Sequence, residues 1–196
     1  SGGNPFFIEE LAALIRESGA GAGRLPETLQ GLVTARLDSL APTERDLLED
    51  CAVVGASGPL DAVVALAAAR EEAEPIVVLQ TLTERELLEL DDDEFRFPSE
   101  VVRDVAYGTL TKAERARRHA VLADWLSKGL REDDAGTSAT ERVAHHYGAA
   151  ALLLRELGTV DGVPADLPER ALAMLELAGD RAWAAELWPS ASRLFE

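Results

Sequence analysis

The sequence predicts a mainly α-helical fold that contains one small β-hairpin. Apolar residues make up 47% of the 196 residues, which is enough to build a buried core. Aromatic residues account for only 5%, and Ala and Leu dominate, a composition that favours close-packed helices over a β-sandwich. The clearest strand signal is ELLELDDDEFRF at 86–97, where two short strands flank an acidic turn.

The first predicted helix begins near residue 4. Asn4 is suited to cap a helix, and Pro5 suits the first helical position. Apolar residues then recur with helical spacing up to Ile15, and the glycine-rich stretch 19–23 ends the helix. Because this helix begins at once with an apolar face, we expect a missing neighbour and a longer parent protein.

Four further helices are predicted before the hairpin, at 24–40, 43–55, 60–69 and 74–85. Thr43 is expected to cap the second of them, and Ser57-Gly58-Pro59 is expected to form a turn before the third. Helices followed by a strand, a turn and a second strand are typical of a winged-helix unit. We place this unit at residues 25–110.

Two capped helices follow the hairpin. Ser99 is expected to cap a helix over EVVRDVAYGTL. Thr111 is expected to cap the next helix, and we assign residues 111–130 as a connecting helix. The polar stretch REDDAGTS at 131–138 is the best candidate for a linker.

The remaining residues, 138–196, are expected to form helical hairpins. Large, small and aromatic positions recur there with the spacing of tetratricopeptide repeats, at Leu175, Gly179, Trp188, Ala191 and Phe195. A single repeat cannot bury its own apolar face, so we expect further repeats in the parent protein.

Several strings of the sequence resemble the STAND class of signalling ATPases. These are GNPFFIEEL, LPETLQGLVTARLDSL, FRFPSEVVRDVAYGTL, ERARRHAVLADWL and AHHY. The chain is most similar to bacterial members in which such a segment lies between an NTPase domain and tetratricopeptide repeats. The resemblance implies the end of a helical lid at 1–24, a winged-helix domain at 25–110, a connecting helix at 111–130, and the start of the repeats at 138–196.

The resemblance implies a non-catalytic regulatory role. Such a segment would couple the nucleotide state of the parent to an output domain, such as an adenylate or guanylate cyclase or a LuxR-type transcription regulator, through a domain rearrangement. ATP or ADP would bind the parent and not this chain, which has no GxxxxGK[ST] run. The implied partners are the upstream NTPase domain of the same chain and a protein or small-molecule ligand at the repeats.

The resemblance also implies roles for three residues. Asn4 and Pro5 are similar to the GNPF motif of the helical lid, where Pro5 would contact adenine and Asn4 would set the turn. Related proteins have Arg-His after the second strand, with the His sensing phosphate, but this chain has Pro98 and Ser99. Ser99 offers a hydroxyl without a titratable charge. The alternative is that Pro5 and Ser99 only begin helices.

Catalytic and metal-binding motifs are missing from the sequence. It contains no HExxH or GxSxG run, and the single cysteine, Cys51, lies in the apolar run CAVVG and is expected to be buried. His145 and His146 are adjacent, with His119 far upstream. We expect these histidines to pack at a helix seam and hold no metal. We nominate no catalytic residue.

The net charge of −17 disfavours phosphate backbones and anionic membranes as partners. An alternative function is an acidic winged-helix transcription factor that binds DNA itself. Against this alternative, acidic residues outnumber basic ones along 70–96. The sequence begins with no signal peptide and holds no long apolar run, so we expect a cytoplasmic protein without a membrane partner.

Overall fold

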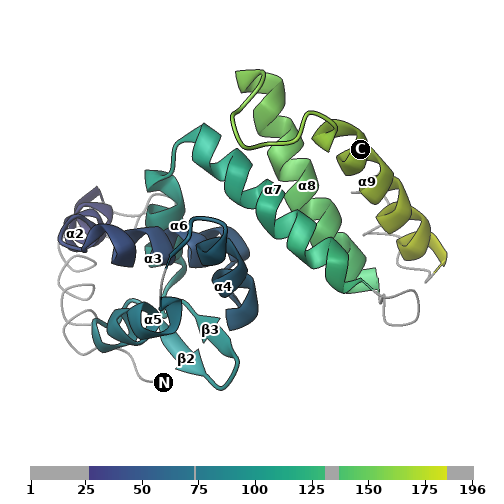
Figure 1. The fold of residues 1–196 in the computed structure, drawn as a ribbon. Coiled ribbons are helices and arrows are strands. Elements are labelled where there is room, and N and C mark those ends of the chain that lie inside the picture. The colour runs from purple at the N-terminus through teal and green to yellow at the C-terminus, as the bar shows by residue number, and fades with distance from the viewer. Residues whose placement is uncertain (1–26, 73, 131–136, 185–196) are drawn as a thin grey trace, which may run out of the picture. The chain divides into compact units, whose positions relative to one another are not determined.

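The computed structural model describes residues 27–72, 74–130 and 137–184 (Figure 1). The described residues form eight helices and one small three-stranded antiparallel sheet. This confirms the predicted fold class, a mainly α-helical protein with a small β-hairpin. The predicted lid at 1–24, with Asn4 and Pro5, lies outside the described residues. None of the helices in the described part of the chain is long and apolar enough to cross a membrane.

The chain divides into two compact units. The first runs to Thr109, and the second begins at Leu110, with the short stretch Ala68–Arg70 grouped with the second. Each unit has its own cluster of buried apolar side chains.

The first unit contains five helices and the sheet. In chain order its elements are α2 (Glu27–Asp38), α3 (Pro42–Val54), β1 (Ser57–Pro59), α4 (Leu60–Ala68), α5 (Pro75–Glu84), β2 (Glu89–Asp91), β3 (Glu94–Arg96) and α6 (Glu100–Thr109). From α3 to β3 this order is helix, strand, two helices and two strands. The sheet order is β1-β3-β2, and Asp92 turns the β2–β3 hairpin with a positive φ of 47°.

The structure corrects the prediction of a turn at Ser57-Gly58-Pro59. These residues form strand β1, in which Gly58 pairs with Phe95 of β3. An added Cβ on Gly58 would lie 3.4 Å from the Phe95 ring and 2.5 Å from Cγ1 of Val54. The glycine that suggested a turn therefore permits a strand to pass close over the buried ring.

The predicted helix caps are confirmed at two positions and wrong at one. The Ser99 hydroxyl accepts a hydrogen bond from the Val101 backbone N–H at 3.2 Å. The Thr111 hydroxyl accepts one from the Glu114 N–H, and the Glu114 carboxylate accepts one from the Thr111 N–H at 2.8 Å. Thr43, in contrast, lies inside α3.

Helix α3 instead begins after Ala41, with Pro42 in its first turn. The Glu44 carboxylate accepts a hydrogen bond from the Ala41 N–H at 2.8 Å. The proline supplies the starting φ and the glutamate satisfies a terminal donor, so a Thr cap is not needed.

The core of the first unit brings every helix of the unit onto the sheet and α3. Its fully buried side chains include Leu37 of α2, Leu47 and Leu48 of α3, Val63 of α4, Leu79 of α5 and Phe95 of β3. Cys51 is also buried in this core, as the sequence predicts.

The second unit contains three described helices that lie side by side (Figure 1). They are α7 (Lys112–Gly129), α8 (Thr137–Leu157) and α9 (Leu167–Ala184). Gly148 of α8 faces Leu175 of α9, and an added Cβ would lie 3.9 Å from the leucine Cδ1, at ordinary van der Waals distance. Leu175 and Gly179 of the predicted repeat lie on α9, whereas its other three positions, Trp188, Ala191 and Phe195, lie outside the described residues.

Candidate functional site

Helix α5 presents an uncharged and partly apolar face. Its sequence, PIVVLQTLTE, contains no Lys or Arg, and Glu84 is its single charged residue. Leu79 and Leu82 are fully buried on its inner side. On the outer side, Ile76 is 43% exposed and Val77 is 54% exposed. Covering a surface of this kind with another apolar surface removes it from water and is favourable in free energy.

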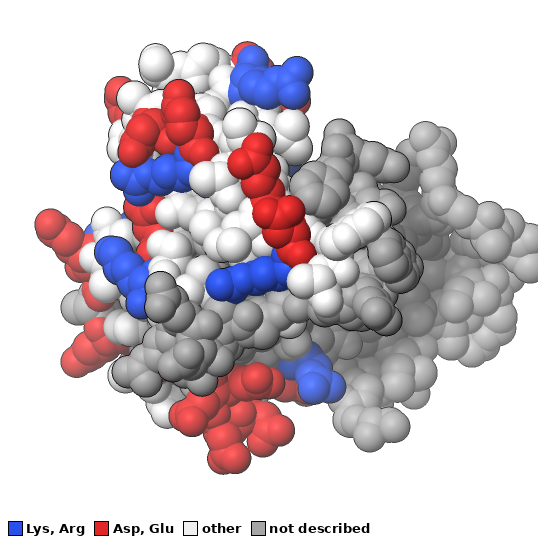
Figure 2. Space-filling view, turned by 90° about the vertical axis from the view of Figure 1, so that its right-hand side faces the viewer, with Lys and Arg blue, Asp and Glu red and all other residues white. Residues whose placement is uncertain are grey.

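The β2–β3 hairpin beside α5 in sequence is strongly acidic. Its carboxylates are Glu89, Asp91, Asp92, Asp93 and Glu94, all of them exposed, and its one basic residue is Arg96. On the face of the molecule that Figure 2 shows, basic side chains are scattered among groups of acidic ones and do not gather in one patch. Neither α5 nor the hairpin offers the basic field that a phosphate backbone requires.

Ser99, the residue in place of the expected histidine, stands directly before α6. Its hydroxyl is half-buried and bonds the helix terminus. One turn later, Arg103 donates from Nε to the Ala52 carbonyl oxygen at 3.2 Å, and its guanidinium lies 5.3 Å from the centre of the Tyr107 ring. The first of these contacts joins α6 to α3, and the second lies within α6.

A polar network joins α2 to the ends of α3 and α5. Arg36 of α2 donates to the carbonyl oxygen of Arg85, the residue directly after α5, at 2.8 Å. The Arg85 side chain in turn pairs with Glu44 of α3, with Nε 3.2 Å from Oε1. No sequence signal identifies this connection, because Arg36 and Arg85 are far apart in the chain and neither lies in a motif.

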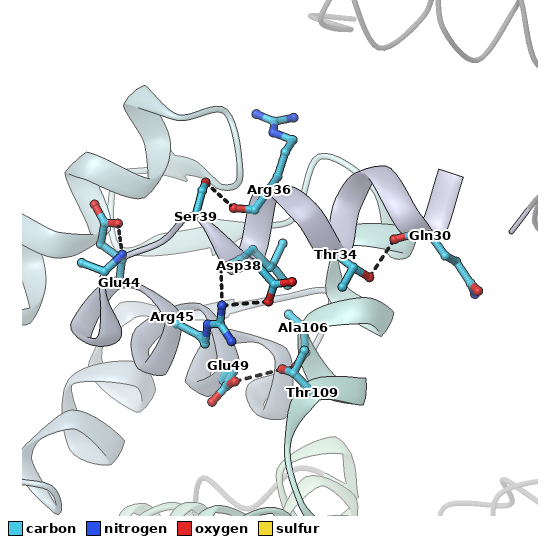
Figure 3. A network of polar contacts seen from close by, with 12 residues as sticks. Gln30, Thr34, Arg36, Asp38, Ser39, Glu44, Arg45, Glu49, Ala106 and Thr109 are labelled. Atoms are coloured by element: carbon cyan, nitrogen blue, oxygen red, sulfur yellow. Dashed lines mark hydrogen bonds and ion pairs between the residues drawn. The ribbon is translucent and has the colours of Figure 1, made fainter. Parts of the chain in front are cut away.

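A second part of the network joins α2, α3 and α6 (Figure 3). Arg45 donates to the Leu37 carbonyl oxygen at 2.9 Å and to the Asp38 carboxylate at 3.0 Å. Glu49, which is buried, accepts a hydrogen bond from the Thr109 hydroxyl at 2.9 Å. The network therefore fixes the end of α2 against the rest of the first unit at several points.

The structure brings His119 beside the adjacent pair His145 and His146, from which it is far in the sequence. His119 of α7 and His146 of α8 are buried, and their Nδ1 atoms lie 2.9 Å apart. The exposed His145 ring is centred 5.0 Å from that of His146. The expectation of packing at a helix seam is confirmed for His119 and His146, while His145 faces solvent.

The surroundings of His146 disfavour its charged form. Burial first, and then the positive charges of His119, His145 and Arg142, lower the pKa of His146 to about 3. In the described part of the chain, no group of three His, Cys, Asp or Glu residues is arranged to hold a metal ion.

Cys51 has the properties of a core residue. Burial first, and then the neighbouring Asp50 carboxylate, raise the pKa of the Cys51 thiol. A thiol that stays protonated and covered is neither a nucleophile nor a metal ligand.

Comparison with known proteins returns no relative: no protein family, curated protein or solved structure matches this chain. A functional assignment therefore depends on the surfaces and contacts described above.

Proposed function

We propose that this chain is a non-catalytic regulatory segment of a STAND-type ATPase, and that its α5 face docks on the NTPase domain that precedes it in the parent protein. The observation that supports this proposal is the outer face of α5, where Ile76 and Val77 are exposed on a helix without Lys or Arg. In a winged-helix unit this is the helix that would contact DNA. Here its composition suits a protein surface.

The free energy of such docking comes from apolar burial. Burying a fully exposed side chain of this size is worth about 1.5–3 kcal/mol, and Ile76 and Val77, which are about half exposed, can each gain roughly half of that. A DNA duplex offers no comparable gain, because the carboxylates of the β2–β3 hairpin repel its phosphates.

The relay passes from α2 to α5. Helix α2 follows the segment that resembles the lid, and Arg36 connects it to the end of α5. A nucleotide-dependent movement of the lid would pull on α2, and this bond with the Arg85–Glu44 pair would pass the movement to α5. The repeats would then bind a protein or small-molecule signal, and an output domain such as a nucleotide cyclase or transcription regulator would respond in the cytoplasm.

The first test uses the longer protein with its NTPase domain, purified, denatured and examined for released nucleotide. We expect bound ADP or ATP. Val77→Asp should speed the release of that nucleotide by about tenfold or more, because it puts a charge into the docked surface. Leu152→Asp is the matched control, since Leu152 is 61% exposed on α8, and it should leave the release rate unchanged. Equal rates for the two variants would refute docking through α5.

Pro5→Ala tests the implied adenine contact in the same protein. We expect it to weaken nucleotide retention, and an unchanged off-rate would remove this role of Pro5.

A separate experiment tests the alternative of DNA binding. Fluorescence anisotropy of a labelled duplex at low salt should not change at micromolar concentrations of the 196-residue chain. A salt-dependent rise in anisotropy would favour the transcription factor over the regulatory segment.

A further inference from the structure

The buried contact between His119 and His146 lies at the seam of two long helices. The Nδ1 atoms of the two rings are 2.9 Å apart, and the rings are centred 5.1 Å apart with their planes inclined by 32°. This distance is that of a hydrogen bond, so one Nδ1 carries the hydrogen and the other accepts it. The contact therefore requires a neutral acceptor ring and two different tautomers.

Protonation destroys this arrangement. A hydrogen added to the accepting Nδ1 would point at the hydrogen of the donor, and a positive ring would be left in a buried place. We propose that the His119–His146 pair makes the α7–α8 contact of the second unit sensitive to pH, intact when the acceptor is neutral and weakened when it is protonated.

The charged groups around the pair add to this effect. Arg142 lies one turn before His146 on α8, Arg115 lies one turn before His119 on α7, and the exposed His145 is adjacent. On α9, the residue after Leu175, which packs near Gly148, is the exposed Glu176. The positive charges oppose a further proton on the pair, while Glu176 faces water and is screened.

The pH range follows from the sign of the shift. The folded-state pKa of His146 is about 3, below the value of about 6.5 in an unfolded chain, so the unfolded state binds more protons between these limits. Stability is therefore fully present above about pH 6.5 and is lost as pH falls toward 3. From about pH 7.5 to about pH 5.5, this single group raises the unfolding equilibrium constant about tenfold.

Tryptophan fluorescence can follow the second unit selectively, because all three tryptophans, Trp125, Trp183 and Trp188, come after Leu110. We would measure urea unfolding of the whole chain at about pH 7.5 and about pH 5.5. The unmodified chain should show the tenfold change, and His146→Gln, which cannot take up a proton, should lose most of it. His145→Gln is the matched control at the neighbouring exposed position and should retain it. Equal pH dependence in the two variants would overturn the proposal.

A second measurement covers the case in which His146→Gln does not fold. Imidazole ¹⁵N NMR of the unmodified chain at about pH 5.5 should show a neutral ring at His146 and opposite tautomers for His119 and His146. A protonated His146 ring in the folded chain at that pH would refute the proposal.

Discussion

A single missing side chain determines how the sheet of the first unit assembles. Gly58 pairs with Phe95, whose ring is fully buried and lies edge-on to Phe97 with ring centres 6.1 Å apart. Any Cβ at position 58 would come within 2.5 Å of Val54 Cγ1. Because β-branched valine is stiff, relief would require a movement of α3 or β1.

Gly58→Ala should therefore lower the free energy of unfolding by about 1–3 kcal/mol. Gly31→Ala is the matched control, since Gly31 is helical and nothing lies within 4 Å of an added Cβ. This control should raise stability by about 0.5–1 kcal/mol, because alanine suits a helix better. Urea unfolding followed by circular dichroism would measure both. Stabilisation by both alanines would show that Val54 and Phe95 leave room for a Cβ at position 58.

At the scale of elements, three side chains join the helices of the second unit. The Tyr147 hydroxyl of α8 donates to the Asp124 carboxylate of α7, which also accepts from Arg170 of α9 at 3.2 Å. Arg170 further pairs with Asp166 at 2.8 Å. Burial, and then the bond to Asp124, raise the pKa of the Tyr147 hydroxyl, so the hydroxyl stays protonated and donates.

Tyr147→Phe should cost about 1–2 kcal/mol, because Asp124 loses a donor at a partly buried site. Asp166→Ala, which removes only an exposed pair of the same arginine, should cost less than about 0.5 kcal/mol. Thermal unfolding of the two variants would separate these values. A larger loss for Asp166→Ala would place the important contact at the start of α9.

Elements that depend on local sequence were predictable. The helical spacing of apolar residues in α5 and the side-chain caps at Ser99 and Thr111 each depend on a few neighbouring residues, and each was found as expected. Strand β1 was missed because Ser57-Gly58-Pro59 has the composition of a turn and becomes a strand only by pairing with distant β3. The His119–His146 contact was missed for a similar reason, since helical spacing does not identify which two helices are neighbours.

For the candidate interface, the absence of basic residues from α5 was visible in the sequence, but the exposure of Ile76 and Val77 was not. An apolar helix in a winged-helix unit could bury either side, and only the packing of Leu79 and Leu82 decides which side faces outward. The lid residues Asn4 and Pro5 stay predictions.

At the scale of the whole molecule, two separate cores allow two separate transitions. Cys51 is the single thiol and lies in the core of the first unit, while the tryptophans all lie in the range of the second. Thiol reactivity and tryptophan fluorescence therefore report different units of the same chain.

In a urea series, Gly58→Ala should lower the midpoint of Cys51 labelling more than that of tryptophan fluorescence. Tyr147→Phe should do the reverse, because its contacts lie in the second unit. Equal shifts of both probes in both variants would show that the chain unfolds as one cooperative body.

The small sheet has one more consequence, for unwanted association between copies. With the order β1-β3-β2, its two outer strands could each accept a strand from another molecule. Each is only three residues long; β1 contains Pro59, which has no N–H to donate, and β2 has exposed carboxylates at Glu89 and Asp91. Both outer strands thus discourage strand addition, so the first unit is protected from aggregating through its sheet.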